Sequence, residues 1–241
     1  MAGRQPGRTV RDLGRELKRS ADPCYRKTIQ TFFKEPIRVY GVRTPDFRRI
    51  SRDYWQKVKH LSREEVLELC EELLAVRNGE ERGVAFDWAY RLRDQYRMAD
   101  FSRFQRWLEQ YVGNWAACDT LSTGVLAEML LRFPPLLPRM KKWARSKNRW
   151  LRRAAAVVFI IPNRHGRFVD DAFETADALL EDPDDMVQKG YGWMLKEIAN
   201  HDQRRVFDYV MKNRHRMPRT ALRYAIEKMP PALKRRAMSR P

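Results

Sequence analysis

The chain has 241 residues, with 49 Lys and Arg against 31 Asp and Glu, which gives a formal net charge of +18 at pH 7. This excess favours a polyanionic partner such as nucleic acid and argues against a protein scaffold, which would need an acidic partner. No run approaches the roughly 18 consecutive apolar residues of a membrane-spanning helix. We therefore expect one domain, residues 1–241, that is not membrane-bound and is located in the cytoplasm with the nucleoid.

Helical patterns begin at the N-terminus. The first twenty residues are basic but lack the apolar core of a signal peptide. Val10, Leu13 and Leu17 have the spacing of an amphipathic helix. The same periodicity continues along the chain, and segments that alternate like strands are essentially missing.

Residues 62–76 form the clearest predicted helix, in which Ser62 and Glu65 have the spacing of a capping box. Asn78-Gly79 follows as a predicted stop. Further proline and glycine breaks divide the chain into helices of ordinary length. These breaks are at Pro36, Gly41, Pro45, Gly113-Asn114, Pro134-Pro135, Pro162, Pro183, Pro218 and Pro230-Pro231.

A repeat runs through the chain. Similar helix-forming segments recur at intervals of about 35 residues, which is typical of paired-helix repeats. Their central positions are Arg48, Arg82, Cys118, Arg153, Lys189 and Arg223. We therefore predict an all-α protein, an α-solenoid of about six HEAT-like helical repeats with a concave basic face.

The central positions are cationic at five of six repeats, which suits a duplex phosphate backbone. We predict Arg48, Arg82, Lys189 and Arg223 as DNA-binding residues, although the abundance of arginine in this chain also explains such a column. The residues that follow Arg82, Arg153 and Lys189 are small, and close helix packing explains them best.

Four side chains fall on one face of the predicted stack. Relative to the central positions, Trp115, Asp119, Arg153 and Trp193 lie at offsets that span an arc of roughly 100° at about 100° per residue. Two indole faces can hold a cation there, while a carboxylate stabilises positive charge that develops nearby. The alternative is that Asp119 is an ordinary acid in the first turn of a helix and that both tryptophans belong to the core.

Cysteines and histidines give no further site. The spacing of Cys24, Cys70 and Cys118 fits neither a disulfide framework nor a zinc site, and buried free thiols are the favoured interpretation. The four histidines show no metal-binding spacing, and phosphate loops and a serine nucleophile elbow are missing. We predict no metal and no cofactor.

Four segments carry a resemblance to a known family: GVRTPDFRRI at 41–50, NWAACD at 114–119, WLRRAA at 150–155 and QKGYGWMLKE at 188–197. Their order and spacing resemble those of the AlkD family of HEAT-like-repeat DNA glycosylases, from about Val10 to about Met229. The resemblance implies excision of N3- and N7-alkylated purines from duplex DNA. Trp115 and Trp193 would then be aromatic walls, Asp119 the catalytic carboxylate and Arg153 a supporting cation.

The residue types fit that chemistry. Alkylation at N3 or N7 makes the purine cationic, and its departure leaves an oxocarbenium-like sugar that Asp119 would oppose, or Asp119 would position the attacking water. Arg153 would hold either a phosphate or Asp119 itself, because its planar fork suits both anions. No matched lysine suggests a Schiff base, so the expected enzyme is a monomeric, monofunctional glycosylase that leaves an abasic site.

The family tends to carry a tyrosine on an early helix close to the lesion, and the nearest alignment puts Phe32 in that region. A phenyl ring keeps the stacking but loses the hydroxyl, so Phe32 is a further predicted DNA contact. The alternative function, from a different class, is a non-catalytic HEAT-like module that binds DNA or RNA through the basic groove.

Overall fold

The computed structural model describes residues 6–239, and helices follow one another along that stretch, apart from a turn and an extended segment between Gln30 and Thr44. Within these residues the β-structure consists of a single antiparallel bridge between Ala21 and Val42. Two β-residues cannot form a sheet, so the predicted all-α fold is confirmed. The first five residues of the basic N-terminal segment lie outside the described residues.

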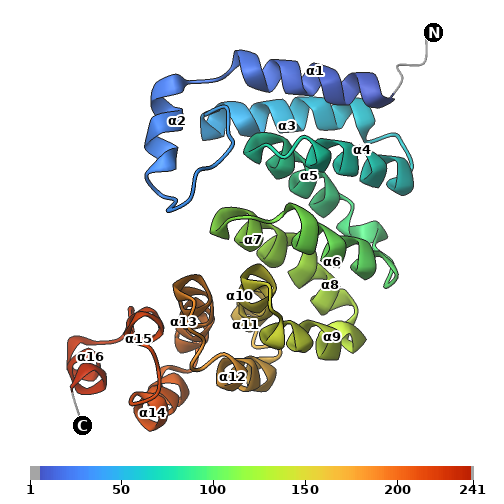
Figure 1. The fold of residues 1–241 in the computed structure, drawn as a ribbon. Helices are drawn as coiled ribbons and strands as arrows, with labels where there is room; N and C mark the ends of the chain where they lie inside the picture. The colour runs from blue at the N-terminus through green and yellow to red at the C-terminus, as the bar shows by residue number, and fades with distance from the viewer. Residues whose placement is uncertain (1–5, 240–241) are drawn as a thin grey trace. The chain divides into compact units, whose positions relative to one another are not determined.

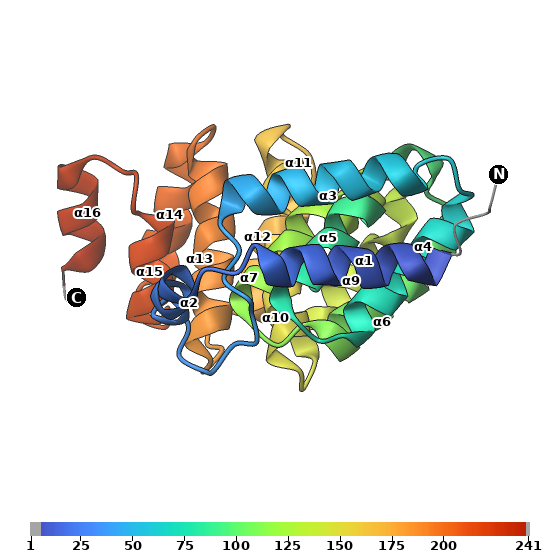
Figure 2. The ribbon, with the colours of Figure 1, turned by 90° about the horizontal axis from the view of Figure 1, so that it is seen from above.

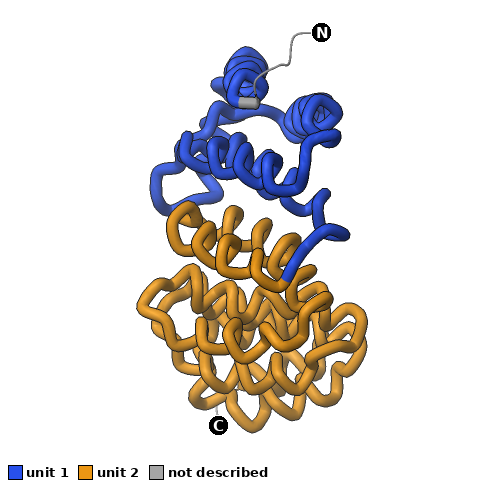
Figure 3. Tube along the Cα trace, turned by 90° about the vertical axis from the view of Figure 1, so that its right-hand side faces the viewer, with its two compact units in different colours: residues 1–97 blue, residues 98–241 orange. Residues whose placement is uncertain are grey.

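The chain forms two compact units, residues 1–97 and residues 98–241 (Figure 3). The first unit contains α1 (Pro6–Arg19), α2 (Pro23–Gln30), α3 (Thr44–Val58), α4 (Arg63–Ala75), α5 (Gly79–Arg91) and the 3-10 helix η1 (Arg93–Gln95). Helix α1 packs on α3 and α4, and α5 packs on α3 and α4. Figure 2 shows α1 and α3 side by side, with α2 running across their direction.

The second unit begins with α6 (Asp100–Tyr111), α7 (Trp115–Leu121), the π-helical turn η2 (Ser122–Leu126) and α8 (Ala127–Arg132). It continues with η3 (Pro134–Leu136), α9 (Leu137–Lys141), η4 (Lys142–Arg145), α10 (Arg149–Val157) and α11 (Ile160–Arg164). The last helices are α12 (Val169–Ala178), α13 (Asp185–Ala199), α14 (Gln203–Asn213), α15 (Arg219–Ala225) and α16 (Pro231–Met238).

The helices follow the predicted period. Each of the six central positions lies on a helix of its own: α3, α5, α7, α10, α13 or α15. In the second unit α7 packs on α10, α10 on α13 and α13 on α15, so successive repeats stack in chain order (Figure 1). Helices α12 and α14 pack on their neighbours in this row. The solenoid-like stacking of helical repeats is therefore confirmed.

Local signals set the helix boundaries largely as expected. Val10, Leu13 and Leu17 are buried along one side of α1, as their spacing predicts. Ser62 and Glu65 form the predicted capping box at the start of α4. Asn78 acts differently, because α4 has already ended at Ala75 and the Asn78 side chain accepts a hydrogen bond from the backbone N–H of Glu80. It therefore starts α5 rather than stopping α4.

The expectation that all three thiols are buried is wrong for one of them. Cys70 and Cys118 are buried, but Cys24 on α2 is exposed. Helix α2 has no buried residue, so its apolar positions do not predict burial. None of the helices between residues 6 and 239 is long and apolar enough to cross a membrane.

Candidate active site

Three successive repeats of the second unit contribute the predicted catalytic residues. Trp115 and Asp119 are on α7, Arg153 is on α10 and Trp193 is on α13. Asn114 sets the start of α7, because its side chain accepts a hydrogen bond from the backbone N–H of Ala117 at 2.9 Å. This cap fixes the first turn, which carries Trp115, and places Asp119 one turn further along the helix.

Asp119 and Arg153 form a bidentate ion pair. Arg153 donates from Nε to Oδ1 of Asp119 at 2.8 Å and from Nη2 to Oδ2 at 2.7 Å. Its Nη1 donates to the backbone carbonyl of Met186 on α13. Of the two anions expected for Arg153, a phosphate or Asp119, the structure therefore shows Asp119. The guanidinium links three helices and fixes the plane of the carboxylate.

A glycine on α13 allows this approach. A Cβ atom at Gly190 would lie 3.1 Å from Cγ of Arg153, which is tighter than an ordinary contact. Because Gly190 has no Cβ, α13 can lie close to α10. This is the close helix packing that was predicted from the small residues after the central positions. Gly83 acts in the same way in the first unit, where a Cβ would lie 2.9 Å from the Phe47 ring.

The pair is largely removed from water. The Arg153 side chain is 6% exposed and that of Asp119 is 14% exposed. Burial raises the pKa of Asp119 above its usual value, and the hydrogen bonds from Arg153 oppose that rise. Burial disfavours the charged guanidinium, but Asp119 outweighs it, so the pKa of Arg153 is raised. An ionised carboxylate with little hydration acts strongly on any cation placed beside it.

The neighbouring thiol is not a nucleophile. Cys118 is fully buried and donates to the backbone carbonyl of Trp150 at 3.4 Å. Burial, with the charge of Asp119, raises the pKa of the Cys118 thiol to about 12. The thiolate, which is the reactive form, is therefore scarce at neutral pH.

The tryptophans divide into two groups. Of the seven tryptophans, four are buried in the core: Trp88, Trp107, Trp143 and Trp150. Trp55, Trp115 and Trp193 are half-buried and leave part of the indole accessible. Trp115 lies four residues before Asp119 on α7, and Trp193 lies three residues after Gly190 on α13. Both tryptophans predicted as aromatic walls thus keep surface with which to meet a ligand.

Glu197 lies beside Trp193 and is a neighbour of the site for which no role is predicted. Trp193 donates from Nε1 to Oε1 of Glu197 at 3.0 Å, while Arg164 and Asn200 donate to Oε2 at 3.2 Å each. Burial opposes ionisation of Glu197, but the hydrogen bonds from Arg164 and Trp193 lower its pKa. The carboxylate therefore fixes the indole plane. The sequence spacing could have predicted this contact, because Glu197 lies four residues after Trp193 on the same face of α13.

A π-helical turn, η2, follows α7 directly. Thr123 in this turn donates from Oγ1 to the backbone carbonyl of Asp119 at 2.7 Å. Such turns are uncommon and occur frequently at functional sites. Here the turn places a side-chain donor for the Asp119 carbonyl two residues beyond the end of α7.

The predicted DNA-binding cations differ in exposure. Arg48 and Arg223 are exposed on α3 and α15. Lys189 is half-buried and pairs with Asp185 at 3.2 Å, and burial lowers the pKa of Arg82. Since Arg153 is buried, the central positions of the second unit do not form a continuous exposed row. Phe32 is 67% exposed and lies in the turn after α2 rather than on a helix.

Among residues 6–239, no group of three or more His, Cys, Asp and Glu side chains is placed to hold a metal ion.

The fold and the site together define a helical-repeat protein that carries a carboxylate–guanidinium pair between α7 and α10, with two half-buried tryptophans on α7 and α13. The profile of the DNA alkylation repair enzyme family matches residues 13–229. The chain belongs to this family, which confirms the predicted resemblance and gives the protein a role in DNA repair.

Solved structures show the same fold. A predicted DNA alkylation repair enzyme from Enterococcus faecalis has a TM-score of 0.76 and 16% identity, over 88% of this chain and 98% of that one. AlkD2 from Streptococcus mutans has a TM-score of 0.64 and 16% identity, over 93% and 99% of the two chains.

A third structure has a ligand. The alkylpurine DNA glycosylase AlkC from Pseudomonas fluorescens, bound to DNA containing an abasic site analogue, has a TM-score of 0.51 and 16% identity. The match covers 92% of this chain and 62% of that one. No curated protein matches the chain by sequence comparison. At this identity the structures define the fold alone.

Proposed function

We propose that the protein is a monofunctional DNA glycosylase that excises N3- and N7-alkylated purines from duplex DNA. The observation that carries the proposal is the Asp119 carboxylate, held in one orientation by both arms of the Arg153 fork and still 14% exposed. The similar fold of the alkylpurine DNA glycosylase AlkC, whose structure contains DNA with an abasic site analogue, supports the same reaction class.

The proposed reaction needs no redox partner. The bond between C1′ of the sugar and the purine nitrogen breaks, and its electron pair leaves with the base, which becomes neutral because the lesion was cationic. Water adds to C1′ and releases a proton, so the strand keeps an abasic sugar. Asp119 opposes the positive charge on the sugar or orients the water, and a single carboxylate can act in either way.

Arg153 acts in this proposal as a positioning residue. Three of its nitrogens are already used by Asp119 and Met186, so it directs the carboxylate rather than binding a phosphate. Trp115 and Trp193 would offer indole faces to the cationic purine, each contact contributing roughly 0.5–2 kcal/mol. Arg48, Arg82, Lys189, Arg223 and Phe32 remain the proposed DNA contacts of a monomeric enzyme.

Base release from duplex DNA containing N7-methylguanine tests the proposal under single-turnover conditions. Asp119→Asn should lower the rate by about 10²–10³, because it removes the charge but keeps the shape. Asp182→Asn is a matched control, since Asp182 forms a similar pair with Arg152, with a shortest contact of 2.6 Å between Nε and Oδ2. The control should retain excision.

Two results would decide against the proposal. If Asp119→Asn released the base as fast as the parent protein, the carboxylate would have no catalytic role. If the parent protein bound duplex DNA and released no cationic base, the protein would be a non-catalytic DNA-binding module.

A further inference from the structure

A surface cavity of about 490 Å³ lies in the second unit, where α11 and α13 end and α12 and α14 begin. Its lining comes from residues 163–171 and 198–205, and we call it the acidic cavity. In Figure 2 the two connections, from α11 to α12 and from α13 to α14, lie along the upper edge of the view. The cavity therefore lies at one edge of the row of stacked helices.

The lining has the opposite charge from the chain as a whole. Asp170, Asp171 and Asp202 face a single arginine, Arg205, in a chain whose formal net charge is +18. Helix formation explains the acids, because Asp170 and Asp171 lie in the first turn of α12 and Asp202 caps α14. Their charge sets the kind of ligand that is attracted, but it does not by itself define a site.

Asn163 supplies a second, independent feature. It lines the cavity and is only 1% exposed, and within residues 6–239 neither its Oδ1 nor its Nδ2 has a hydrogen-bond partner. Over the same stretch it holds two of the three buried side-chain polar atoms that lack a partner. A buried polar group without a partner costs stability, and native proteins keep few of them. A ligand that supplies both partners would remove this cost.

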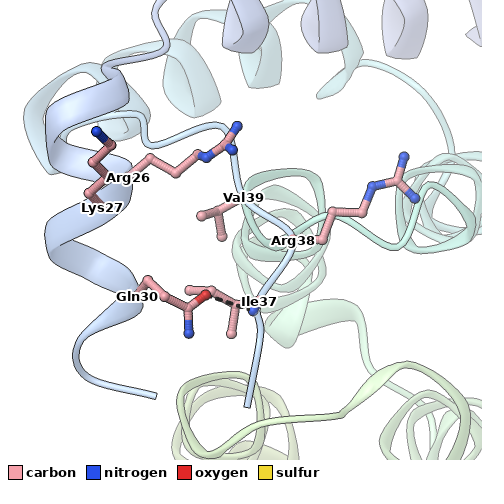
Figure 4. Close-up of a pocket in the computed structure, with 6 residues that line it drawn as sticks. All are labelled: Arg26, Lys27, Gln30, Ile37, Arg38 and Val39. Carbon is pink, nitrogen blue, oxygen red and sulfur yellow. Dashed lines mark hydrogen bonds between the residues drawn. The ribbon is translucent and has the colours of Figure 1, made fainter. Parts of the chain in front are cut away.

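The cleft of the first unit shows the contrast. It lies between α2 and residues 37–39, and its amide side chain is Gln30 (Figure 4). Gln30 accepts from the backbone N–H of Ile37 at 3.0 Å and donates to the carbonyl of Glu35 at 3.0 Å. The chain itself thus supplies partners for that amide. No residue in the described part of the chain does so for Asn163.

The chemistry of the lining indicates a peptide with basic side chains. The Asn163 amide presents a carbonyl acceptor and an NH₂ donor, and a peptide group offers the complementary pair whichever way the amide is turned. The edge of a nucleobase can offer a similar pair, but its strand brings phosphates that the aspartates repel. A Lys or Arg side chain is instead attracted. Phe168 adds a half-buried ring that already has the Arg167 guanidinium 5.1 Å from its centroid, a contact that suits a cation.

The walls of the cavity are fixed within the chain. In the connection after α11, the backbone N–H of Arg167 donates to the carbonyl of Pro162 at 3.0 Å, and that of Gly166 donates to the carbonyl of Asn163 at 3.0 Å. Across the cavity, Asp170 pairs with Arg205 and joins α12 to α14. A rigid frame of this kind lowers the entropy lost when a ligand binds.

We propose that the acidic cavity is a docking site for a basic peptide segment of a partner protein. A backbone peptide group of the partner pairs with the Asn163 amide, and a Lys or Arg side chain lies among the three aspartates. The cavity volume is in the range of roughly 300–1,000 Å³ that is usual for ligand sites. This function is separate from the chemistry at Asp119.

The first test uses a synthetic probe, the peptide acetyl-Gly-Arg-Gly-Lys-Gly-Arg-amide, and nuclear magnetic resonance of the ¹⁵N-labelled protein. The Asn163 side-chain amide signals and the Gly166 backbone signal should shift in a saturable way. A peptide of the same length with Glu in place of Arg and Lys should bind several-fold more weakly. No saturable shift at these positions with the basic probe would overturn the site.

The second test separates a ligand role of Asn163 from a structural one. Asn163→Ala should unfold at the same temperature as the parent protein or higher, because it removes an amide without partners, and it should lose most of the probe binding reported by Gly166. The control is Asn213→Ala, since Asn213 is also buried in a helix but donates to the carbonyl of Tyr209 at 3.0 Å. The control should unfold at a lower temperature and bind the probe. An equal loss of stability in both variants, or full binding by Asn163→Ala, would contradict the proposal.

The third test concerns charge. Asp202→Asn removes one negative charge, and asparagine caps a helix as well as aspartate does, so α14 should remain intact. Its affinity for the basic probe should fall several-fold. Asp208→Asn is the control, because Asp208 is an exposed acid of α14 outside the cavity. Equal affinities in the two variants would remove the aspartates from the site.

Duplex DNA and base release complete the comparison. A shift of the Asn163 amide signals by undamaged duplex, with none by the basic probe, would assign the cavity to nucleic acid and overturn the peptide. Asn163→Ala should release N7-methylguanine as fast as the parent protein. The docking site and the glycosylase proposal can therefore fail independently.

Discussion

The Asp119–Arg153 pair and the α2 region, residues 23–43, both contain guanidinium groups, but the two regions place them in opposite surroundings. Arg153 is 6% exposed, has three nitrogens engaged and neutralises a carboxylate. Arg26 and Arg38 are exposed and pair with no acid among residues 6–239. The first arrangement fixes geometry and the second leaves charge exposed, so we expect the pair to control the chemical step and exposed cations to contribute to DNA affinity and its salt dependence.

Arg153→Gln is expected to have the largest effect. It leaves Asp119 buried without a countercharge, and removing one partner of a buried pair costs about 3–5 kcal/mol. Urea unfolding should show that loss, and base release should fall with it because the carboxylate is no longer oriented. Arg152→Gln is the control, since it breaks the neighbouring pair with Asp182. It should lower stability but retain excision, and a loss of excision as large as in Arg153→Gln would show that the Asp119 pair has no special role.

The pH dependence of excision should sharpen the same comparison. Only the ionised carboxylate opposes a cation, and burial raises the pKa of Asp119 above its ordinary value of 3.8. The single-turnover rate should therefore fall about tenfold per pH unit below that raised pKa. Asp119→Asn supplies the background of spontaneous base loss at each pH. An inflection at or below the ordinary value would mean that the ionised form is not destabilised by burial.

Glu197→Ala should have a smaller effect that is specific to the lesion. It removes the charged acceptor of the Trp193 indole N–H, and a hydrogen bond to a charged group contributes about 1.5–3 kcal/mol. Excision of cationic purines should fall several-fold while affinity for undamaged duplex is unchanged. Glu197→Gln should restore most of the activity, because its amide oxygen can still accept from Trp193. Glu227→Ala, which removes an exposed partner of Lys196, is the control.

Gly190→Ala should have the smallest effect. The new Cβ would lie 3.1 Å from Cγ of Arg153, so the guanidinium must shift by a few tenths of an ångström. Since a displacement of about 1 Å can cost about 10²-fold in rate, we expect a loss of about two- to fivefold in base release. Gly113→Ala is the control, because a Cβ there would meet no atom within 4 Å. Equal rates in both variants would show that the approach of α13 does not matter for Arg153.

The sequence predicts much of the fold and the central contact of the candidate site. Apolar periodicity gives the helices, and the interval of about 35 residues places Asp119 and Arg153 on adjacent repeats, where they pair. It does not predict that Arg153 is buried, because a charge that is neutralised by a partner looks the same in a sequence as an exposed one.

Two other features could not be derived from the repeat. The contact between Trp193 and Glu197 depends on which side of α13 the next helices leave open, and periodicity alone does not specify this. Helix α2 and the extended segment after it both lie outside the repeat pattern. Gly41 is predicted only as a break, whereas its role depends on how closely it approaches Asp22.

The distribution of the site over three repeats limits how such a chain can change in length during evolution. Asp119, Arg153 and the Met186 carbonyl belong to α7, α10 and α13, and their contacts require these helices to be consecutive neighbours. Duplication or deletion of a repeat between them would separate the carboxylate from its partner. Gain or loss of repeats is therefore tolerated only outside residues 115–197, and descendants of this chain should vary in length at their ends.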